Sequence, residues 1–231
     1  MFRFLRTGLA MITLLTFIAM PSLHAQEAAA KKKTAKTLVQ LALAFQNYYD
    51  TMGYFPPPTK IGRKGKPVYS WRVEICPFIE EDKLFMEIDV TNEPWDSEKN
   101  KKQLKRVPKL FEPPDAKEKE QGLTHYQYIV GGGAMFEDML KKVKLADITD
   151  GTANTIMIVE AEEAVPWTKP ADVTYDPKKP LPKFGGMLKD GFHIVLADGK
   201  VRFIKKETDE KLIRALITRA GGEKVDLNKL K

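Results

Sequence analysis

The chain has 231 residues, of which 43% are hydrophobic, and its formal net charge is +7. This composition supports a buried core and excludes an intrinsically disordered protein. Cys76 is the single cysteine, so an internal disulfide is excluded. Stability must therefore come from packing.

The first 25 residues have the pattern of a cleavable secretory signal. Arg3 and Arg6 precede an apolar run, residues 9–20, that is short for a membrane-spanning helix. We expect residues 1–25 to be removed before Gln26, although an uncleaved anchor is the alternative. Because two arginines leave with the signal, the net charge falls from +7 to +5. The mature protein is expected to be exported, to the periplasm or beyond, without stable membrane insertion.

Helical patterns dominate the first half of the chain. Apolar residues recur at helical spacing from Thr34 to Asp50, and Gly53 ends this predicted helix. A second, mostly helical region covers residues 71–88 with a break at Pro77, and a short charged helix is expected within 97–106.

The second half has short runs of β-branched and aromatic residues, which predict strands. These runs are residues 124–130, 155–160, 192–197 and 200–204. Asp198 and Gly199 predict a two-residue hairpin turn with positive φ at both positions, and a closing helix follows around residues 212–217. Helices first and strands later favour an α+β fold: an N-terminal helix packed on an antiparallel sheet, with extra short helices and a C-terminal hairpin plus helix. Residues 26–231 are expected to form one domain.

Groups for nucleophilic catalysis are scarce. Beyond the signal the chain has Ser70, Ser97 and Cys76, and two histidines, His125 and His193, both in predicted strands. Cys76 has apolar neighbours, which are typical of a buried and inert thiol. A packed histidine is the simpler interpretation of each histidine, and a general base is the alternative. We therefore predict no catalytic residues.

Metal and nucleic-acid sites are weakly indicated. Asp147, Asp150 and Asn154 could offer oxygen ligands to calcium, but they lack the spacing of an EF-hand loop, and a solvated turn is the alternative. Basic runs at residues 31–33 and 101–106 have acidic neighbours, so they do not form the one-signed stripe that nucleic-acid binding needs. We expect neither a cofactor nor a nucleic-acid partner.

Trp95 and Trp167 are candidate binding residues. Each follows a proline and precedes a polar residue, so each ring either packs inward or is presented to a ligand from a stiff loop.

Many segments in order resemble a large family of pilin-like proteins of unknown function, abundant in planctomycete bacteria and known for a C-terminal H-x(9)-D-G motif. These segments are residues 41–57, 70–73, 93–97, 124–126, 148–155, 160–161, 165–170, 197–204 and 212–219. The resemblance implies a helix packed on an antiparallel sheet.

The chain departs from this family at two places. Many members keep a glutamate at the fifth position of a long apolar prepilin helix, whereas residues 9–13 after Gly8 contain none. The family histidine aligns with Leu188, and His193 has an H-x(4)-D-G spacing instead. We therefore expect a signal-peptide variant of the family that is not a pilus subunit.

Three functions are consistent with these features. The leading hypothesis is an exported, non-catalytic interaction or structural module whose partners are envelope proteins or glycans. The second is a periplasmic solute- or glycan-binding protein that uses Trp95 and Trp167. The third is a hydrolase with an acid pair that sequence spacing does not identify.

Overall fold

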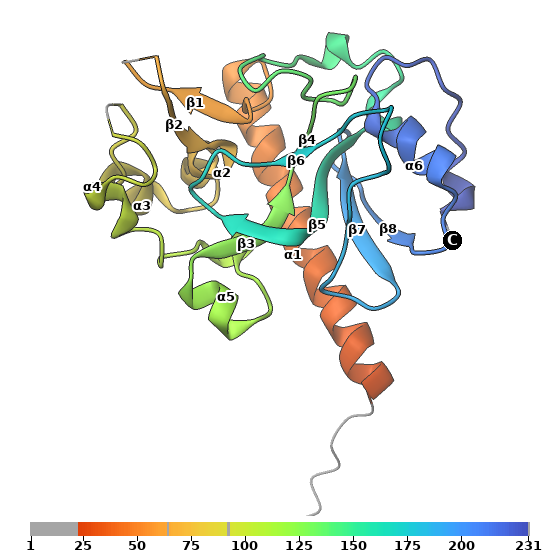
Figure 1. Cartoon of the computed structure of the whole chain (residues 1–231), viewed down its shortest axis with the longest axis horizontal. Helices are drawn as coiled ribbons and strands as arrows, with labels where there is room; N and C mark the ends of the chain where they lie inside the picture. Colours follow the sequence, from red (N-terminus) through yellow and green to blue (C-terminus); the bar gives the residue numbers. More distant parts are fainter. Residues whose placement is uncertain (1–22, 64, 92, 231) are drawn as a thin grey trace, which may run out of the picture.

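The computed structural model describes residues 23–63, 65–91 and 93–230. The apolar run of the expected signal, residues 9–20, lies outside these residues. The expected cut before Gln26 falls in the first turn of helix α1, Leu23–Met52. This helix is the long rod at the centre of Figure 1. It starts eleven residues before the predicted Thr34, because the alanine- and lysine-rich stretch has high helix propensity without an apolar period.

The central sheet has four antiparallel strands in the order β3-β5-β7-β8. They are β3 (Leu123–Gln127), β5 (Ile156–Pro166), β7 (Gly191–Leu196) and β8 (Val201–Lys205). All four follow the predicted strand segments to within a few residues, except that β5 extends six residues further. With the long helix they confirm the predicted α+β class.

Two smaller sheets and several short helices surround the central sheet. β1 (Thr59–Ile61) and β2 (Pro67–Ser70) pair antiparallel, whereas β4 (Ile129–Val130) and β6 (Val173–Thr174) pair in parallel. The α-helices are α2 (Trp71–Glu74), α3 (Asp82–Glu87), α4 (Glu98–Lys101), α5 (Ala116–Glu120) and α6 (Glu210–Ile217). In the described residues, 3-10 turns occupy Cys76–Phe78, Lys109–Phe111, Leu145–Asp147, Thr152–Asn154 and Leu227–Lys229.

The sheet separates two cores, because strand side chains alternate between its faces. Val195 of β7 packs in the core that α1 covers. Its neighbours Ile194 and Leu196 pack with Leu216 of α6 on the other face. The molecule is therefore built in three layers, with α1 and α6 on opposite faces of the sheet (Figure 1).

A buried polar cluster joins the first half of the chain to the second. The guanidinium of Arg72 donates to the Asp172 carboxylate at 2.8 Å, and both side chains are 0% exposed. Asp172 also accepts hydrogen bonds from the Trp71 indole at 3.1 Å and from the Tyr128 backbone at 2.9 Å. Three donors on one carboxylate fix the loop that carries Asp172 against α2 and the start of β4.

Candidate functional site

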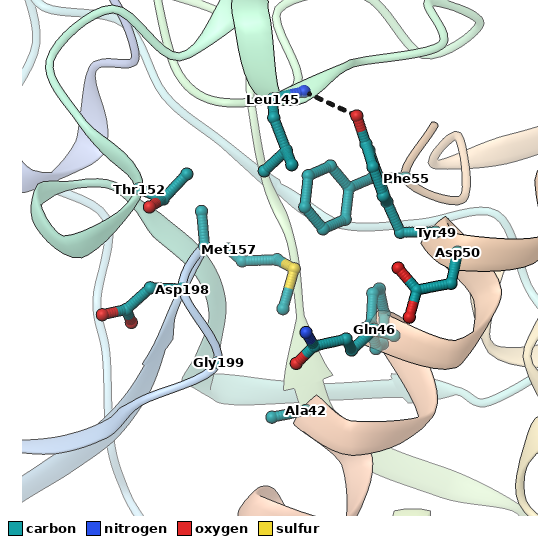
Figure 2. Close-up of a pocket in the computed structure, with 12 residues that line it drawn as sticks. Ala42, Gln46, Tyr49, Asp50, Phe55, Leu145, Thr152, Met157, Asp198 and Gly199 are labelled. Carbon is teal, nitrogen blue, oxygen red and sulfur yellow. Dashed lines mark hydrogen bonds between the residues drawn. The ribbon is translucent and has the colours of Figure 1, made fainter. Parts of the chain in front are cut away.

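A crevice lies between the C-terminal half of α1 and the loop that joins β7 to β8 (Figure 2). Its volume is ≈180 Å³. The floor is apolar, with Phe45, Phe55 and Met157, and polar side chains stand around it. The lining is Ala42, Phe45, Gln46, Tyr49, Asp50, Phe55, Leu145, Thr152, Met157, Ala197, Asp198 and Gly199.

The polar groups of this crevice belong to different elements. Asp50 comes from α1, whereas Asp198 comes from the β7–β8 loop on the opposite side (Figure 2). The Asp198 carboxylate accepts the backbone N–H of Lys200 at 2.9 Å and lies 2.9 Å from the Lys200 ammonium. The Asp198 carboxylate therefore makes its polar contacts within its own loop.

The crevice is small for a ligand site, since such sites usually measure about 300–1,000 Å³. Its lining contains no serine, cysteine or histidine. This arrangement suits a small polar group held over an apolar floor better than a covalent reaction.

The β7–β8 loop differs in detail from the predicted turn. The Leu196 N–H donates to the Lys200 carbonyl, so three residues form the loop instead of two. Gly199 has φ +82°, whereas Asp198 does not have a positive φ. The prediction of positive φ at both positions was therefore wrong. A three-residue loop that ends in a left-handed glycine gives the same chain reversal.

A groove opens between α1 and β8, on the N-terminal side of the crevice. Its volume is ≈730 Å³. Ala28, Lys31, Lys32, Ala35 and Val39 line it from one face of α1, and Gly199, Lys200, Val201, Arg202 and Phe203 line it from the β7–β8 loop and β8. His193 of β7 completes the lining.

His193 forms a buried pair with Glu160 of β5. Its Nδ1 lies 3.1 Å from a Glu160 carboxylate oxygen, which also accepts the His193 backbone N–H at 2.5 Å. The other Glu160 oxygen is buried without a hydrogen-bond partner. Burial, followed by the charge of Glu160, raises the pKa of the neighbouring Tyr126 phenol. The pair fixes the ring of His193 at the groove, a role that sequence reasoning did not find.

The other candidates for nucleophilic chemistry have structural partners. The ring nitrogens of His125 lie 2.9 Å from the Ala161 carbonyl and 2.9 Å from the Glu118 carboxylate. The Ser70 hydroxyl donates to the Trp167 carbonyl at 2.8 Å. Burial raises the pKa of the Cys76 thiol well above its usual range. These side chains make contacts within the fold, and burial disfavours the reactive thiolate form of Cys76.

The two tryptophans lie in different environments. Trp167 is 0% exposed, and its indole N–H donates to the Leu104 carbonyl at 2.9 Å. Trp95 is half-buried, with the Lys169 ammonium 5.7 Å from its ring centre. Neither side chain lines the crevice or the groove. The Trp167 ring is thus part of the core, whereas the Trp95 ring is partly accessible to solvent.

The proposed calcium ligands also have other partners. The Asp150 carboxylate accepts the backbone N–H groups of Gly221 at 2.7 Å and Gly222 at 2.8 Å. The Asp147 carboxylate accepts the Lys144 N–H at 2.8 Å, and the Asn154 amide donates to the Asp150 carbonyl at 2.9 Å. Among the described residues, no group of three or more His, Cys, Asp or Glu is placed to hold a metal ion.

Residues 24–138, just under half of the chain, match the model of a family described as "Protein of unknown function (DUF1559)". The match supports a relationship to DUF1559. It includes all but the first residue of α1 and ends before β5, so the α1 side of the groove lies inside it and β8 lies outside. No curated protein and no solved structure matches the chain. Within the part of the chain that the structure describes, no helix is both long and apolar enough to cross a membrane.

Proposed function

We propose that this DUF1559-related chain is an exported interaction module of the cell envelope that performs no catalysis. The observation that carries the proposal is the groove between α1 and β8, whose volume of ≈730 Å³ exceeds the ≈180 Å³ of the crevice. Apolar side chains from both elements line it, which is typical of a surface that receives a partner.

Exposed apolar residues continue this surface along α1. Val39 is 54% exposed and lines the groove, and Leu43, one turn further along the helix, is 60% exposed. Large branched side chains at i and i+4 share one face of a helix. A partner that covers this face would remove both side chains from water.

The chemistry of the buried groups also supports a non-catalytic function. Ser70, Cys76 and His125 are each held by the fold, as described above. The expected signal places the protein outside the cytoplasm, where its partners would be envelope proteins or glycans. Planctomycete origin and relation to pilin-like proteins remain parts of the proposal that rest on sequence resemblance.

The crevice favours a second candidate function, the binding of a small solute. Its apolar floor and its polar rim of Gln46, Asp50 and Thr152 could hold a compact group within ≈180 Å³. In that case Gln46→Ala should weaken binding of the solute and leave the partners of α1 unchanged.

Photocrosslinking in the native host tests the leading function. A photoreactive amino acid at position 39 or 43 should give crosslinks to the same envelope component, and the protein should fractionate with the envelope. Leu140, which is 53% exposed, is the matched control and should give none of these products. A cytoplasmic location, or identical products from all three positions, would contradict the proposal.

A further inference from the structure

β8 is an edge strand that borders the groove. In the order β3-β5-β7-β8 it has a paired neighbour on one side only. No strand of the described residues pairs with the other side of β8, and five consecutive residues, 199–203, line the groove.

The alternation of hydrogen-bonded and non-hydrogen-bonded residue pairs between β7 and β8 shows which backbone groups of β8 face away from β7. The Leu196 N–H donates to the Lys200 carbonyl at one end, and the Lys206 N–H donates to the Asp190 carbonyl at the other. Hydrogen-bonded pairs alternate along an antiparallel ladder, so Arg202 and Ile204 bond inward to β7. Val201 and Phe203 therefore turn their N–H and C=O groups away from the sheet.

These outward groups lack backbone partners among the described residues. No backbone hydrogen bond from outside the ladder reaches Val201 or Phe203. The Val201 carbonyl accepts one bond, from the neighbouring Arg202 guanidinium at 3.3 Å. An edge with open N–H and C=O groups is a template for an added strand.

The side chains around the groove would accept alternate residues of such a strand. Phe203 lies on the α1 face of β8, where the Lys31 ammonium sits 3.1 Å from its ring centre and the His193 ring contacts it edge-on. Val201 and Val39 extend this apolar surface. A strand laid along β8 would place every second side chain against it.

The charge of the groove selects the partner. Lys31 pairs with Asp190 and Lys200 pairs with Asp198, both through ammonium–carboxylate contacts of about 3 Å. Lys32 and Arg202 have no carboxylate partner among the described residues. Two uncompensated cations beside an open edge favour acidic segments and repel basic ones.

We propose that the groove between α1 and β8 binds an extended acidic peptide segment, which adds to β8 as a fifth strand of the sheet. This inference rests on the proposed function and names its partner chemistry. Strand addition supplies affinity through main-chain hydrogen bonds, and the apolar and basic side chains supply specificity.

Synthetic peptides test the proposal on the purified chain. A fluorescent ten-residue peptide of alternating valine and glutamate should bind saturably in an anisotropy titration, and a valine–lysine peptide should not bind. Two further versions of the valine–glutamate peptide carry N-methyl groups on every second residue, one version on the valines and the other on the glutamates. Only one of these sets of peptide N–H groups would face β8, so one of the two versions should bind about tenfold or more weakly. Lys32→Glu and Arg202→Glu should each weaken it about tenfold. Lys102→Glu, an exposed lysine outside the groove, should leave it unchanged.

Hydrogen exchange separates strand addition from simple charge attraction. The amides of Val201 and Phe203 should exchange more slowly when the valine–glutamate peptide is bound, while those of Arg202 and Ile204, already bonded to β7, should not change. Equal binding of both N-methylated peptides, or unchanged exchange at positions 201 and 203, would overturn the proposal. So would tighter binding to phosphatidylglycerol vesicles than to the peptide. If the crosslinks from positions 39 and 43 are found but the peptide fails to bind, the interaction module stands and strand addition alone is wrong.

Discussion

Replacing Asp172 by alanine should destabilise the protein strongly. Among the described residues Asp172 is the only carboxylate paired with the Arg72 guanidinium, and both side chains are 0% exposed. The substitution removes this partner and also the acceptor of the Trp71 indole N–H and of the Tyr128 backbone N–H. Breaking a buried ion pair by deleting one partner usually costs about 3–5 kcal/mol, because the remaining charge stays buried without compensation.

The expected loss is large compared with the roughly 5–15 kcal/mol by which domains are stable. For a domain of this size each kcal/mol corresponds to about 2–4 °C, so Asp172→Ala should lower Tm by about 6–20 °C. Urea denaturation followed by circular dichroism at neutral pH gives the free energy of unfolding directly.

Two matched variants identify the cause of this loss. Glu112 pairs with Lys119 at 2.8 Å on the surface, where the two side chains are 32% and 50% exposed. Glu112→Ala should therefore change stability by less than about 1 kcal/mol. The double variant Arg72→Met, Asp172→Leu removes both charges and should recover much of the lost stability. An Asp172→Ala protein within about 1 kcal/mol of the parent would refute the reasoning.

Three further outcomes follow from the packing and the expected signal. Trp167→Ala should lower the free energy of unfolding by about 3–5 kcal/mol, since the ring is fully buried. Trp95→Ala should lower it clearly less, because Trp95 is half-buried, and chemical denaturation of both variants checks which loss is larger. Gly199→Val should lower the free energy of unfolding by about 1–3 kcal/mol, because the φ of +82° strains a residue with a side chain. A Cβ at this position would make only an ordinary van der Waals contact, so the loss would come from the backbone and not from a steric clash. A melting curve like that of the parent would contradict this explanation. The mature protein should begin near Gln26, and an intact mass that still includes Met1 in exported material would contradict the cleavable signal.

Much of the fold could be predicted because local sequence patterns decide it. The runs that became β3, β5, β7 and β8 are rich in β-branched and aromatic residues, so their strand character is local. The sequence pattern did not predict the first part of α1, because residues 23–33 have no apolar residues at helical spacing. This part of the helix borders the groove and covers little of the core, so its fold does not require such spacing.

The candidate site could not be predicted to the same extent, because its parts meet only through the topology. Glu160 and His193 lie 33 residues apart and come together because β5 and β7 are neighbours in the sheet. One signal was present in the sequence: each is an ionisable residue inside a run of apolar strand residues. That β8 is the edge strand follows from the strand order, which the sequence does not reveal.

The buried link between Arg72 and Asp172 also limits the order in which the chain can fold. The two residues are 100 positions apart, and the Ser70 hydroxyl reaches the Trp167 carbonyl across 97 positions. The segment around α2 therefore cannot complete its polar contacts until the chain has been synthesised past Asp172. Contacts between distant positions slow folding, because a long loop must close first. If the chain is exported as proposed, such a delay would keep the polypeptide unfolded, and so competent to cross the membrane, until it reaches the other side.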